Sequence, residues 1–438
     1  MAYNNLYHQY FINDKDYKFN SISDYEKLGK IGTGQFSTVY KVRNKHTGDI
    51  YAMKVIEKRP ESQKAEQNKQ IKREIDNLIK CYHWETNYNT VKLFNFIETE
   101  EQYIMIFNYC DTTLEQYIEK KYPDKKMPLD QIKLLFLELN QGFRNLYLEK
   151  VIHRDIKINN ILLEYRFGDE NDFIPRVADF GISRENSTDS NPMTASISWL
   201  LLSAPEILQN GTDYSFASDL WSIGVLLYKI AFGKYPYEGN GPVDIFMKIM
   251  NSGSKKFEKS KDDNFNDLIN KLLEKDKDKR ITYEKYFNHP FFKYEEPQEI
   301  IELNKKYNLN ISSYSREFRT ESKNGSLLLK DLSVCHFIRL KELNLQYCNI
   351  NDLSPLTSDT FKDLVFLNLQ YNSITNLSAL KNIKFLDIRE MYFGLNNITD
   401  ISPLENIPFR RLSVVSFAGN KIVWNEETKR IYNKIIKK

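Results

Sequence analysis

The chain has 438 residues, of which 41% are hydrophobic, 28% charged and 13% aromatic, and its 62 basic and 59 acidic side chains give a formal net charge of +3. This length predicts two or more domains, and the composition excludes a wholly disordered chain. Because the charges nearly balance, the sequence lacks the basic excess of a nucleic-acid-binding protein, and we expect no nucleic-acid partner.

The cysteines and the N-terminus indicate the compartment. Four cysteines without a CxxC pair are too few for a disulfide framework in a chain of this length. The N-terminus has neither a basic nor an apolar signal region, and no apolar run is long enough to span a membrane. We therefore expect free thiols in a cytoplasmic protein without a membrane span, with the nucleus as the open alternative.

The first regular elements follow a polar and aromatic N-terminal extension, residues 1–23. From Tyr25, alternating apolar residues predict strands, and the segment 31–39 (IGTGQFSTV) has the form of a glycine-rich hairpin. Gly32 and Gly34 lack a Cβ, so the backbone there can approach phosphate groups, and Val39 can cover an adenine ring. Ser37 stands where such hairpins carry a third glycine. Taken alone, this pattern is also typical of an ordinary turn.

A lysine lies within the next apolar strand, Ala52-Met53-Lys54-Val55-Ile56. An ammonium group is costly to bury unless it is paired. The charged helical stretch that follows, from about Glu61 to Lys80, contains a candidate partner in Glu74. The sequence therefore predicts an ion pair between Lys54 and Glu74.

A compact set of polar residues follows the region of helical spacing that begins near Leu129. The segment 153–160 reads HRDIKINN, and Asp179-Phe180-Gly181 comes after it. Asp155 can serve as a base and Lys157 as a fixed positive charge, whereas Asn160 and Asp179 offer oxygen ligands for Mg²⁺. Together these residues predict phosphoryl transfer.

Through these motifs the chain resembles the eukaryotic protein kinase family over residues 24–294. The resemblance implies an α+β, bilobal fold with a small β-rich N-lobe and a larger α-rich C-lobe, and it implies ATP and Mg²⁺ as cofactors. It makes Lys54 the contact to the α- and β-phosphates, with Glu74 as its anchor. It makes Asp155 the acceptor of the substrate hydroxyl proton and Lys157 the partner of the γ-phosphate, a pattern of Ser/Thr kinases.

The resemblance also implies a nucleotide pocket. Asn108 and Cys110, in the hinge between the lobes, would offer backbone groups to adenine, and Ala52 and Leu162 would enclose the ring. The full set of expected nucleotide-binding residues is Ile31, Gly32, Gly34, Val39, Ala52, Lys54, Asn108, Cys110 and Leu162. The expected metal ligands are Asn160 and Asp179.

Further motifs support the family, and one departs from it. Glu206, in Ala204-Pro205-Glu206, is expected to pair with Arg280, and Asp219 to accept hydrogen bonds from the backbone of the catalytic loop. Trp199, however, stands where the family places a hydroxyl beside Asp155. The apolar run around it is compatible with a hydrophobic substrate residue, with self-association or with inward packing.

Arg154, beside Asp155, indicates an activation segment that is ordered by a phosphate group. We expect phosphorylation at Thr194 or Ser196. The alternative is that these hydroxyls are ordinary polar residues of an exposed loop.

A repeat follows residues 295–333, which we interpret as a linker with a possible helical cap. A shift of 24 residues aligns Cys348, Asn372, Asn396 and Asn420. The pattern LxxLxLxxN/CxI over residues 334–438 resembles the leucine-rich repeat. That resemblance implies a small solenoid with a C-terminal cap, in which the Asn side chains bond the backbone of adjoining turns.

Two functions follow from these resemblances. The first is a Mg-ATP-dependent Ser/Thr protein kinase that acts on protein substrates and whose repeats bind a protein partner. The second is a pseudokinase-like scaffold that retains the nucleotide site while the repeats carry the function. Transfer to a small molecule or lipid is disfavoured by Glu206 and Asp219. The substrate, the partner of the repeats and the oligomeric state stay open.

Overall fold

The computed structural model describes residues 21–34, 37–82, 89–179, 197–210, 214–251, 257–338, 340–386 and 388–436. The chain divides into two compact units, Met1–Lys293 and Tyr294–Lys438. Each unit has its own buried apolar cluster. The expected N-terminal extension lies largely outside the described residues.

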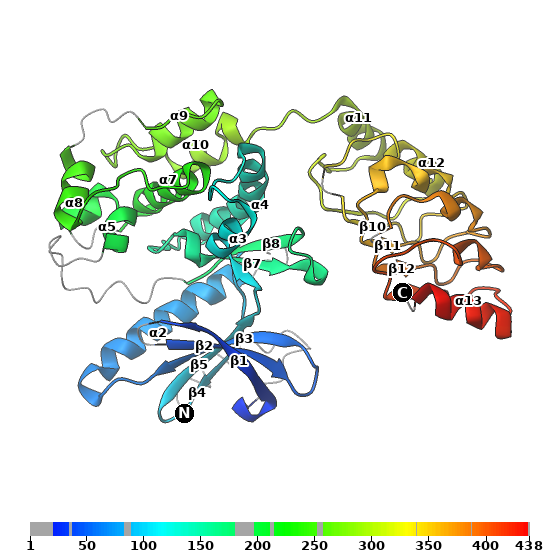
Figure 1. Cartoon of the computed structure of the whole chain (residues 1–438), viewed down its shortest axis with the longest axis horizontal. Coiled ribbons are helices and arrows are strands. Elements are labelled where there is room, and N and C mark those ends of the chain that lie inside the picture. Colours follow the sequence, from blue (N-terminus) through cyan, green and yellow to red (C-terminus); the bar gives the residue numbers. More distant parts are fainter. Residues whose placement is uncertain are drawn as a thin grey trace. The chain divides into compact units, whose positions relative to one another are not determined.

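The first unit begins with a five-stranded antiparallel sheet in the order β1-β2-β3-β5-β4 (Figure 1). Its strands are β1 (Tyr25–Thr33), β2 (Ser37–Asn44), β3 (Ile50–Glu57), β4 (Leu93–Glu98) and β5 (Gln102–Asn108). One helix, α2 (Glu61–Tyr82), connects β3 to β4. We call the sheet and α2 the N-lobe.

Alternation along the strands gives this sheet two buried faces. Met53 and Ile104 belong to one apolar cluster, whereas their neighbours Ile56 and Met105 belong to another, together with Ile75 of α2. Successive side chains of a strand point to opposite faces, so a mostly apolar strand such as β3 can be covered on both sides. The helix covers one face and thereby brings Glu74 towards β3.

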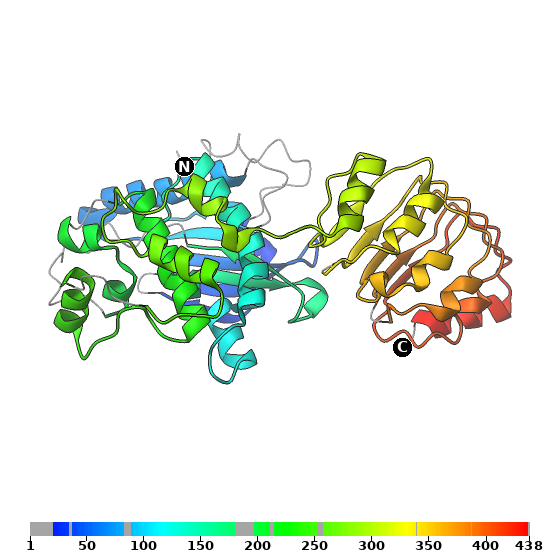
Figure 2. The same cartoon turned by 90° about the horizontal axis from the view of Figure 1, so that it is seen from above.

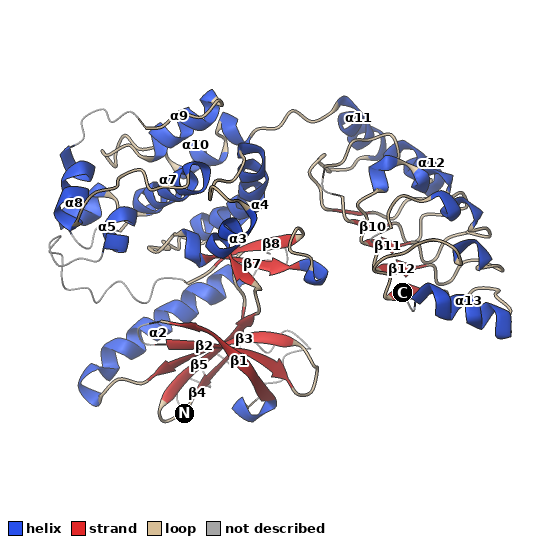
Figure 3. Cartoon of the chain, in the orientation of Figure 1, coloured by secondary structure: helices blue, strands red, loops and turns tan. Residues whose placement is uncertain are grey.

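The rest of the first unit, which we call the C-lobe, is mainly helical (Figure 3). Its helices are α3 (Leu114–Lys121), α4 (Leu129–Leu148), α5 (Ile197–Leu202), α6 (Pro205–Asn210), α7 (Phe216–Phe232), α8 (Pro242–Asn251), α9 (Asp263–Leu272) and α10 (Tyr283–Phe287). A three-stranded sheet in the order β6 (Thr112–Thr113), β7 (Ile161–Tyr165) and β8 (Phe173–Val177) faces the N-lobe. Helix α7 is buried along nearly its whole length and ends at Gly233, which has φ 72°. The small N-lobe sheet and the helical C-lobe that the sequence predicts are therefore present.

The second unit is built on a parallel sheet, and Figure 2 shows its strands lying side by side. The order is β13 (Val414–Ser416), β12 (Glu390–Tyr392), β11 (Phe366–Asn368), β10 (Glu342–Asn344) and β9 (Glu317–Arg319). From β10 to β13, paired residues are 24 positions apart, as in Leu343, Leu367, Met391 and Val415. All four side chains are buried. The spacing between the strands is therefore the spacing of the sequence repeat.

Asparagine side chains join the turns that follow these strands. Nδ2 of Asn396 donates to the carbonyl oxygens of Leu369 (2.9 Å) and Phe393 (3.0 Å), and its Oδ1 accepts from the backbone N–H of Ile374 (2.9 Å). Asn372 and Asn420 make the corresponding bonds one repeat before and one after. The predicted structural role of these asparagines is confirmed.

Residues 295–333 differ from a linker. They form α11 (Gln298–Tyr307), β9 and α12 (Gly325–Leu332), and β9 adds the edge strand to the sheet. Phe318 of β9 is fully buried, as are Ile300 and Leu328 of the helices. The linker part of this interpretation is wrong, because the apolar residues of this polar stretch are buried in the core of the second unit. The helical structure that the interpretation allowed for is present as α11 and α12. At the other end, α13 (Glu426–Ile436) buries Ile431 and Ile435.

Within the described residues, no helix is both long and apolar enough to cross a bilayer.

Candidate functional site

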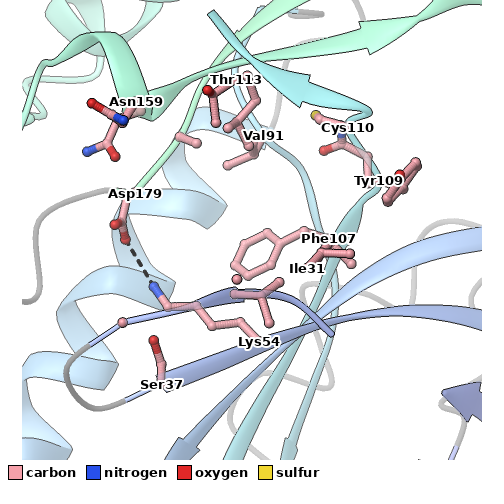
Figure 4. A pocket seen from close by; sticks show the side chains of 18 of the residues that line it. Ile31, Ser37, Lys54, Val91, Phe107, Tyr109, Cys110, Thr113, Asn159 and Asp179 are labelled. Atoms are coloured by element: carbon pink, nitrogen blue, oxygen red, sulfur yellow. Dashed lines mark hydrogen bonds and ion pairs between the residues drawn. The ribbon is translucent and has the colours of Figure 1, made fainter. Parts of the chain in front are cut away.

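A cavity of about 450 Å³ opens in the first unit between the N-lobe sheet and the small sheet of the C-lobe. Every residue predicted to bind nucleotide lines it: Ile31, Gly32, Gly34, Val39, Ala52, Lys54, Asn108, Cys110 and Leu162. Glu74 and the two predicted metal ligands, Asn160 and Asp179, line it as well. Figure 4 shows Lys54 and Asp179 at one end of this cavity and Cys110 and Tyr109 at the other. The pocket therefore has one end at the Lys54–Asp179 ion pair and the other at Tyr109 and Cys110.

The charged end is organised by Lys54. Its Nζ lies 3.0 Å from Oδ1 of Asp179 and 3.2 Å from Oε1 of Glu74. Burial by itself lowers the pKa of Lys54, but Asp179 and Glu74 more than reverse this effect and leave the pKa above its ordinary value. The predicted pair with Glu74 is present, and Asp179 is a second partner.

The two carboxylates respond differently to this cation. Lys54 holds the pKa of Asp179 below its usual value, so that carboxylate is ionised at neutral pH. Burial raises the pKa of Glu74 despite the attraction of Lys54. Glu74 thus depends on Lys54 to carry its charge, whereas Asp179 keeps its charge readily.

The glycine-rich hairpin leaves room over the cavity. A Cβ added at Gly32 would meet only Val39, at 3.7 Å, an ordinary contact distance. The protein itself therefore does not require glycine at position 32. Gln35 and Phe36, at the tip of the hairpin, lie outside the described residues.

Asp155, Lys157 and Asn160 form one hydrogen-bonded set in the loop before β7. Nζ of Lys157 lies 2.8 Å from Oδ2 of Asp155. Nδ2 of Asn160 donates to the same Oδ2 (2.9 Å) and to the carbonyl oxygen of Asp155 (2.8 Å). Asp155 and Lys157 are not among the residues that line the cavity, but Asn160 lines it and connects them to it.

The loop is fixed from below by α7. Asp219 accepts hydrogen bonds from the backbone N–H groups of His153 (2.7 Å) and Arg154 (2.9 Å). Arg154 has φ 68°, a conformation that is rare for a long side chain. The predicted role of Asp219 is confirmed, since its two oxygens hold the backbone N–H groups of this strained residue and of the residue before it.

The apolar run at Trp199 forms α5, and it packs largely inward. Leu200 and Leu202 are buried, and Trp199 and Leu201 are half-buried against the C-lobe core. Ile197, at the start of the helix, is exposed. Of the three interpretations of this run, inward packing accounts for the two buried leucines. Phe180, Gly181 and the predicted phosphorylation sites Thr194 and Ser196 lie outside the described residues.

The sequence interpretation missed several residues of the cavity. Val91, Thr113, Gln116 and Asn159 line it. Thr113 accepts a hydrogen bond from the backbone N–H of Gln116 and caps α3, so an N-cap pattern, Thr-x-x-Gln, marked this position. Val91 lies before β4 and reaches the cavity because its N–H bonds the carbonyl oxygen of Val177 on β8 (3.0 Å). The sequence around Val91 contains no local pattern that predicts such a long-range pairing.

Comparison with known proteins places this geometry in a family. A family model described as "Protein kinase domain" matches residues 25–292. Serine/threonine-protein kinase 36 of Mus musculus is 29% identical over 267 residues, which are 61% of this chain and 19% of that protein. Serine/threonine-protein kinases ATG1b and ATG1a of Arabidopsis thaliana are 31% and 30% identical, over 62% and 64% of this chain and 37% and 43% of their own lengths. The matched segments are thus less than half of these relatives. By the extent of the family match and the arrangement of its pocket, the chain belongs to the protein kinase domain family.

Proposed function

We propose that this protein transfers the γ-phosphate of ATP to Ser or Thr hydroxyls of protein substrates. One observation carries the proposal: Lys54, Glu74 and Asp179 meet at the charged end of a cavity, and Asn160 connects that cavity to Asp155 and Lys157. Phosphoryl transfer depends mainly on positioning and charge stabilisation, and these residues supply both. The relatives named above are serine/threonine-protein kinases, which supports the Ser/Thr class.

The cavity suits ATP in size and chemistry. Its volume of about 450 Å³ lies within the roughly 300–1,000 Å³ of small-molecule sites. Val39, Ala52 and Leu162 offer apolar contact for adenine, and the backbone at Asn108 and Cys110 can bind its polar edge. Lys54 would hold the α- and β-phosphates at the other end, where Gly32 leaves the backbone accessible.

The residues present also fit Mg²⁺. Both hydrogen bonds from Nδ2 of Asn160 go to Asp155. The side-chain atom of Asn160 that would coordinate Mg²⁺ is therefore Oδ1. Asp179 offers an ionised carboxylate. Among the described residues, no group of three or more His, Cys, Asp or Glu side chains could hold a metal by itself. This agrees with Mg²⁺, which takes one or two protein carboxylates and completes its shell with phosphates and water. When bound, the ion neutralises charge on the phosphates.

Asp155 would receive the substrate hydroxyl. Its Oδ2 is held by Lys157 and Asn160, which fixes the orientation of the carboxylate. From there Asp155 can accept the hydroxyl proton, and Lys157, also close by, can balance negative charge on the transferred group.

We also propose that the second unit is a leucine-rich-repeat domain that binds a protein partner. The 24-residue register of its strands and the asparagine bonds between turns support this assignment. Tyr347, Tyr371 and Leu395 occupy one position in three successive repeats and are all exposed, and the two tyrosine rings stack at 4.2 Å. Exposed aromatic side chains are enriched at protein interfaces. Tyr371→Ala is expected to weaken capture of that partner without changing phosphate transfer.

One assay tests the catalytic proposal. ATP, Mg²⁺ and a generic protein substrate are incubated with the unmodified chain and with Asp155→Asn, and labelled Ser or Thr is measured. We expect transfer by the unmodified chain and its loss in the variant. Transfer that survives the substitution would come from a contaminating kinase. No transfer by either protein, with ATP still bound, would favour the alternative of a nucleotide-binding scaffold.

A further inference from the structure

Asn108, at the end of β5, is bonded to both lobes through its side chain. Its Oδ1 accepts a hydrogen bond from the backbone N–H of Lys92, just before β4 in the N-lobe (2.9 Å). Its Nδ2 donates to Oε2 of Glu164, on β7 of the C-lobe (3.0 Å). One amide thus joins the two lobes beside the chain segment that connects them.

Glu164 is in turn fixed by a buried arginine. Nε of Arg176, on β8, lies 2.6 Å from the same Oε2, and NH1 of Arg176 donates to the carbonyl oxygen of Thr90 (3.2 Å). The side chain of Arg176 is only 6% exposed, against 32% for Glu164. A buried guanidinium requires its carboxylate partner, so the position of Glu164 is set by Arg176 rather than by solvent.

Glu164 and Arg176 lie next to the nucleotide cavity without lining it. Asn108, Cys110 and Leu162 line the cavity, whereas Glu164 and Arg176 do not. Leu162 pairs directly with Arg176 across the two strands and shares a face of β7 with Glu164. The polar cluster therefore adjoins the end of the cavity that Asn108 and Cys110 line.

We propose that Glu164 and Arg176 are positioning residues, which act through the Asn108 side chain to hold the hinge backbone in the orientation that binds adenine. We call Lys92, Asn108, Glu164 and Arg176 the hinge clasp. The inference rests on the proposed function, because it presumes an adenine ligand. A hinge held before binding loses less conformational freedom when the ligand arrives, and affinity increases accordingly.

The chemistry of Asn explains the residue at position 108. The site needs one group that accepts from a backbone N–H and another that donates to a carboxylate, and an amide supplies both. A carboxylate there would accept from Lys92 but would repel Glu164. An apolar side chain would leave the partly buried N–H of Lys92 without this acceptor.

Calorimetric binding of adenosine alone, and of ATP with Mg²⁺, to the full chain tests the clasp. Asn108→Asp is expected to weaken both ligands by about tenfold, the effect of losing one charge-assisted hydrogen bond. Asn108→Ala, which keeps the pair of Glu164 with Arg176, is expected to weaken both in the same ratio. Lys54→Met, at the phosphate end, should weaken ATP and leave adenosine unchanged.

A reciprocal variant gives the most specific readout. In Asn108→Asp combined with Glu164→Gln, the introduced carboxylate accepts from Lys92 and from Nε2 of the introduced amide, whose oxygen can accept from Nε of Arg176. The cluster keeps its net charge, but the carboxylate moves from residue 164 to residue 108, so Arg176 loses its direct ion pair. We expect the double variant to recover part of the adenosine affinity that Asn108→Asp loses, because the hydrogen bond between residues 108 and 164 is restored while the ion pair of Arg176 is not.

A buried asparagine elsewhere in the N-lobe serves as the matched control. Oδ1 of Asn44, at the far end of β2, accepts from the backbone N–H of His46 (2.8 Å). Asn44→Ala should lower thermal stability without changing adenosine affinity. The clasp is wrong if Asn108→Asp binds adenosine like the unmodified chain, or if the double variant stays as weak as Asn108→Asp. If the unmodified chain binds neither adenosine nor ATP, the proposed function falls and the clasp with it.

Discussion

Arg280 and Glu206 form a bidentate ion pair in the interior of the C-lobe. NH1 and NH2 of Arg280 lie 2.7 and 3.0 Å from the two carboxylate oxygens of Glu206, and both side chains are buried. The arginine also donates to the carbonyl oxygens of Ala217 (2.7 Å) and Glu274 (2.8 Å). The pair predicted from sequence is therefore the centre of a network that joins α6, the start of α7 and the segment after α9.

Breaking this pair from one side should be costly. Glu206→Ala leaves a buried guanidinium without its carboxylate, and we expect the free energy of unfolding to fall by about 3–5 kcal/mol. Removing the cation as well, in Glu206→Ala with Arg280→Met, eliminates the uncompensated charge. The double variant should therefore lose less than the sum of the two single losses. Urea unfolding of the three variants measures this, and strict additivity would contradict the coupling.

The decrease of stability with rising pH that Glu74 causes should become steeper when Lys54 is removed. In Lys54→Met, buried Glu74 loses its cation, so its pKa in the folded state, already raised by burial, rises further. A group whose folded pKa exceeds its unfolded value binds more protons in the folded state. Its stabilising contribution is thus complete below the unfolded pKa and is lost as pH rises through the folded pKa.

We therefore expect Lys54→Met to become less stable from pH 5 to pH 8, by at most about 1.4 kcal/mol per pH unit, the slope for one proton. Adding Glu74→Gln should flatten this slope, which identifies the titrating group. Asp179 acts in the opposite direction in the unmodified chain. Because Lys54 lowers its pKa, its contribution is present above the unfolded value of 3.8 and is lost as pH falls through the folded pKa. Unfolding free energies measured from pH 5 to pH 8 test the effect of Glu74, and those measured below the unfolded pKa of Asp179 test the effect of Asp179.

Sequence reasoning located the residues whose chemistry is local or whose burial requires a partner. Lys54 in an apolar strand requires a carboxylate, and Glu74 on the following helix provides one. Asn396 and its repeat equivalents stand at a fixed interval, so their shared role could be inferred from spacing alone. In these cases the residues that interact belong to neighbouring elements of the chain, or they recur at the interval of the sequence repeat.

What escaped prediction depends on register between distant segments. Glu164 meets Asn108 only because β7 pairs with β8 in one alignment and the hinge passes beside them. Phe318, alone in a polar stretch, completes the sheet of the second unit because β10 offers it an open edge. Glu164 has no periodic neighbour that would have marked it, and Phe318 stands 25 residues before its partner Leu343, one more than the interval of 24 that aligns the other strands. Side-chain pairing across a sheet follows from a register that composition does not encode.

The asparagines of the second unit should stabilise it, and the effect of replacing one should be confined to the neighbouring repeats. Asn396→Ala removes three donated hydrogen bonds and leaves the N–H of Ile374 without its acceptor. We expect a loss of about 2–4 kcal/mol, given about 1–3 kcal/mol for each unsatisfied buried group. Hydrogen–deuterium exchange should accelerate across residues 366–398 and stay unchanged in the first unit. Asn397→Ala is the matched control, since Asn397 joins the turn through its backbone N–H. Equal exchange in the two variants would contradict this role of Asn396.

Glycine at position 32 should matter for ligand binding and not for folding. A Cβ there would meet only Val39, at an ordinary contact distance, so Gly32→Ala should keep its free energy of unfolding within about 0.5 kcal/mol. The added methyl group, however, enters the cavity where phosphates are expected, and we expect weaker binding of ATP with adenosine binding retained. Gly29→Ala is the control in the same strand, because a Cβ there meets no atom within 4 Å and Gly29 does not line the cavity. Thermal unfolding and calorimetry separate the two effects. A large loss of stability in Gly32→Ala would mean that the hairpin itself, rather than a ligand, requires this glycine.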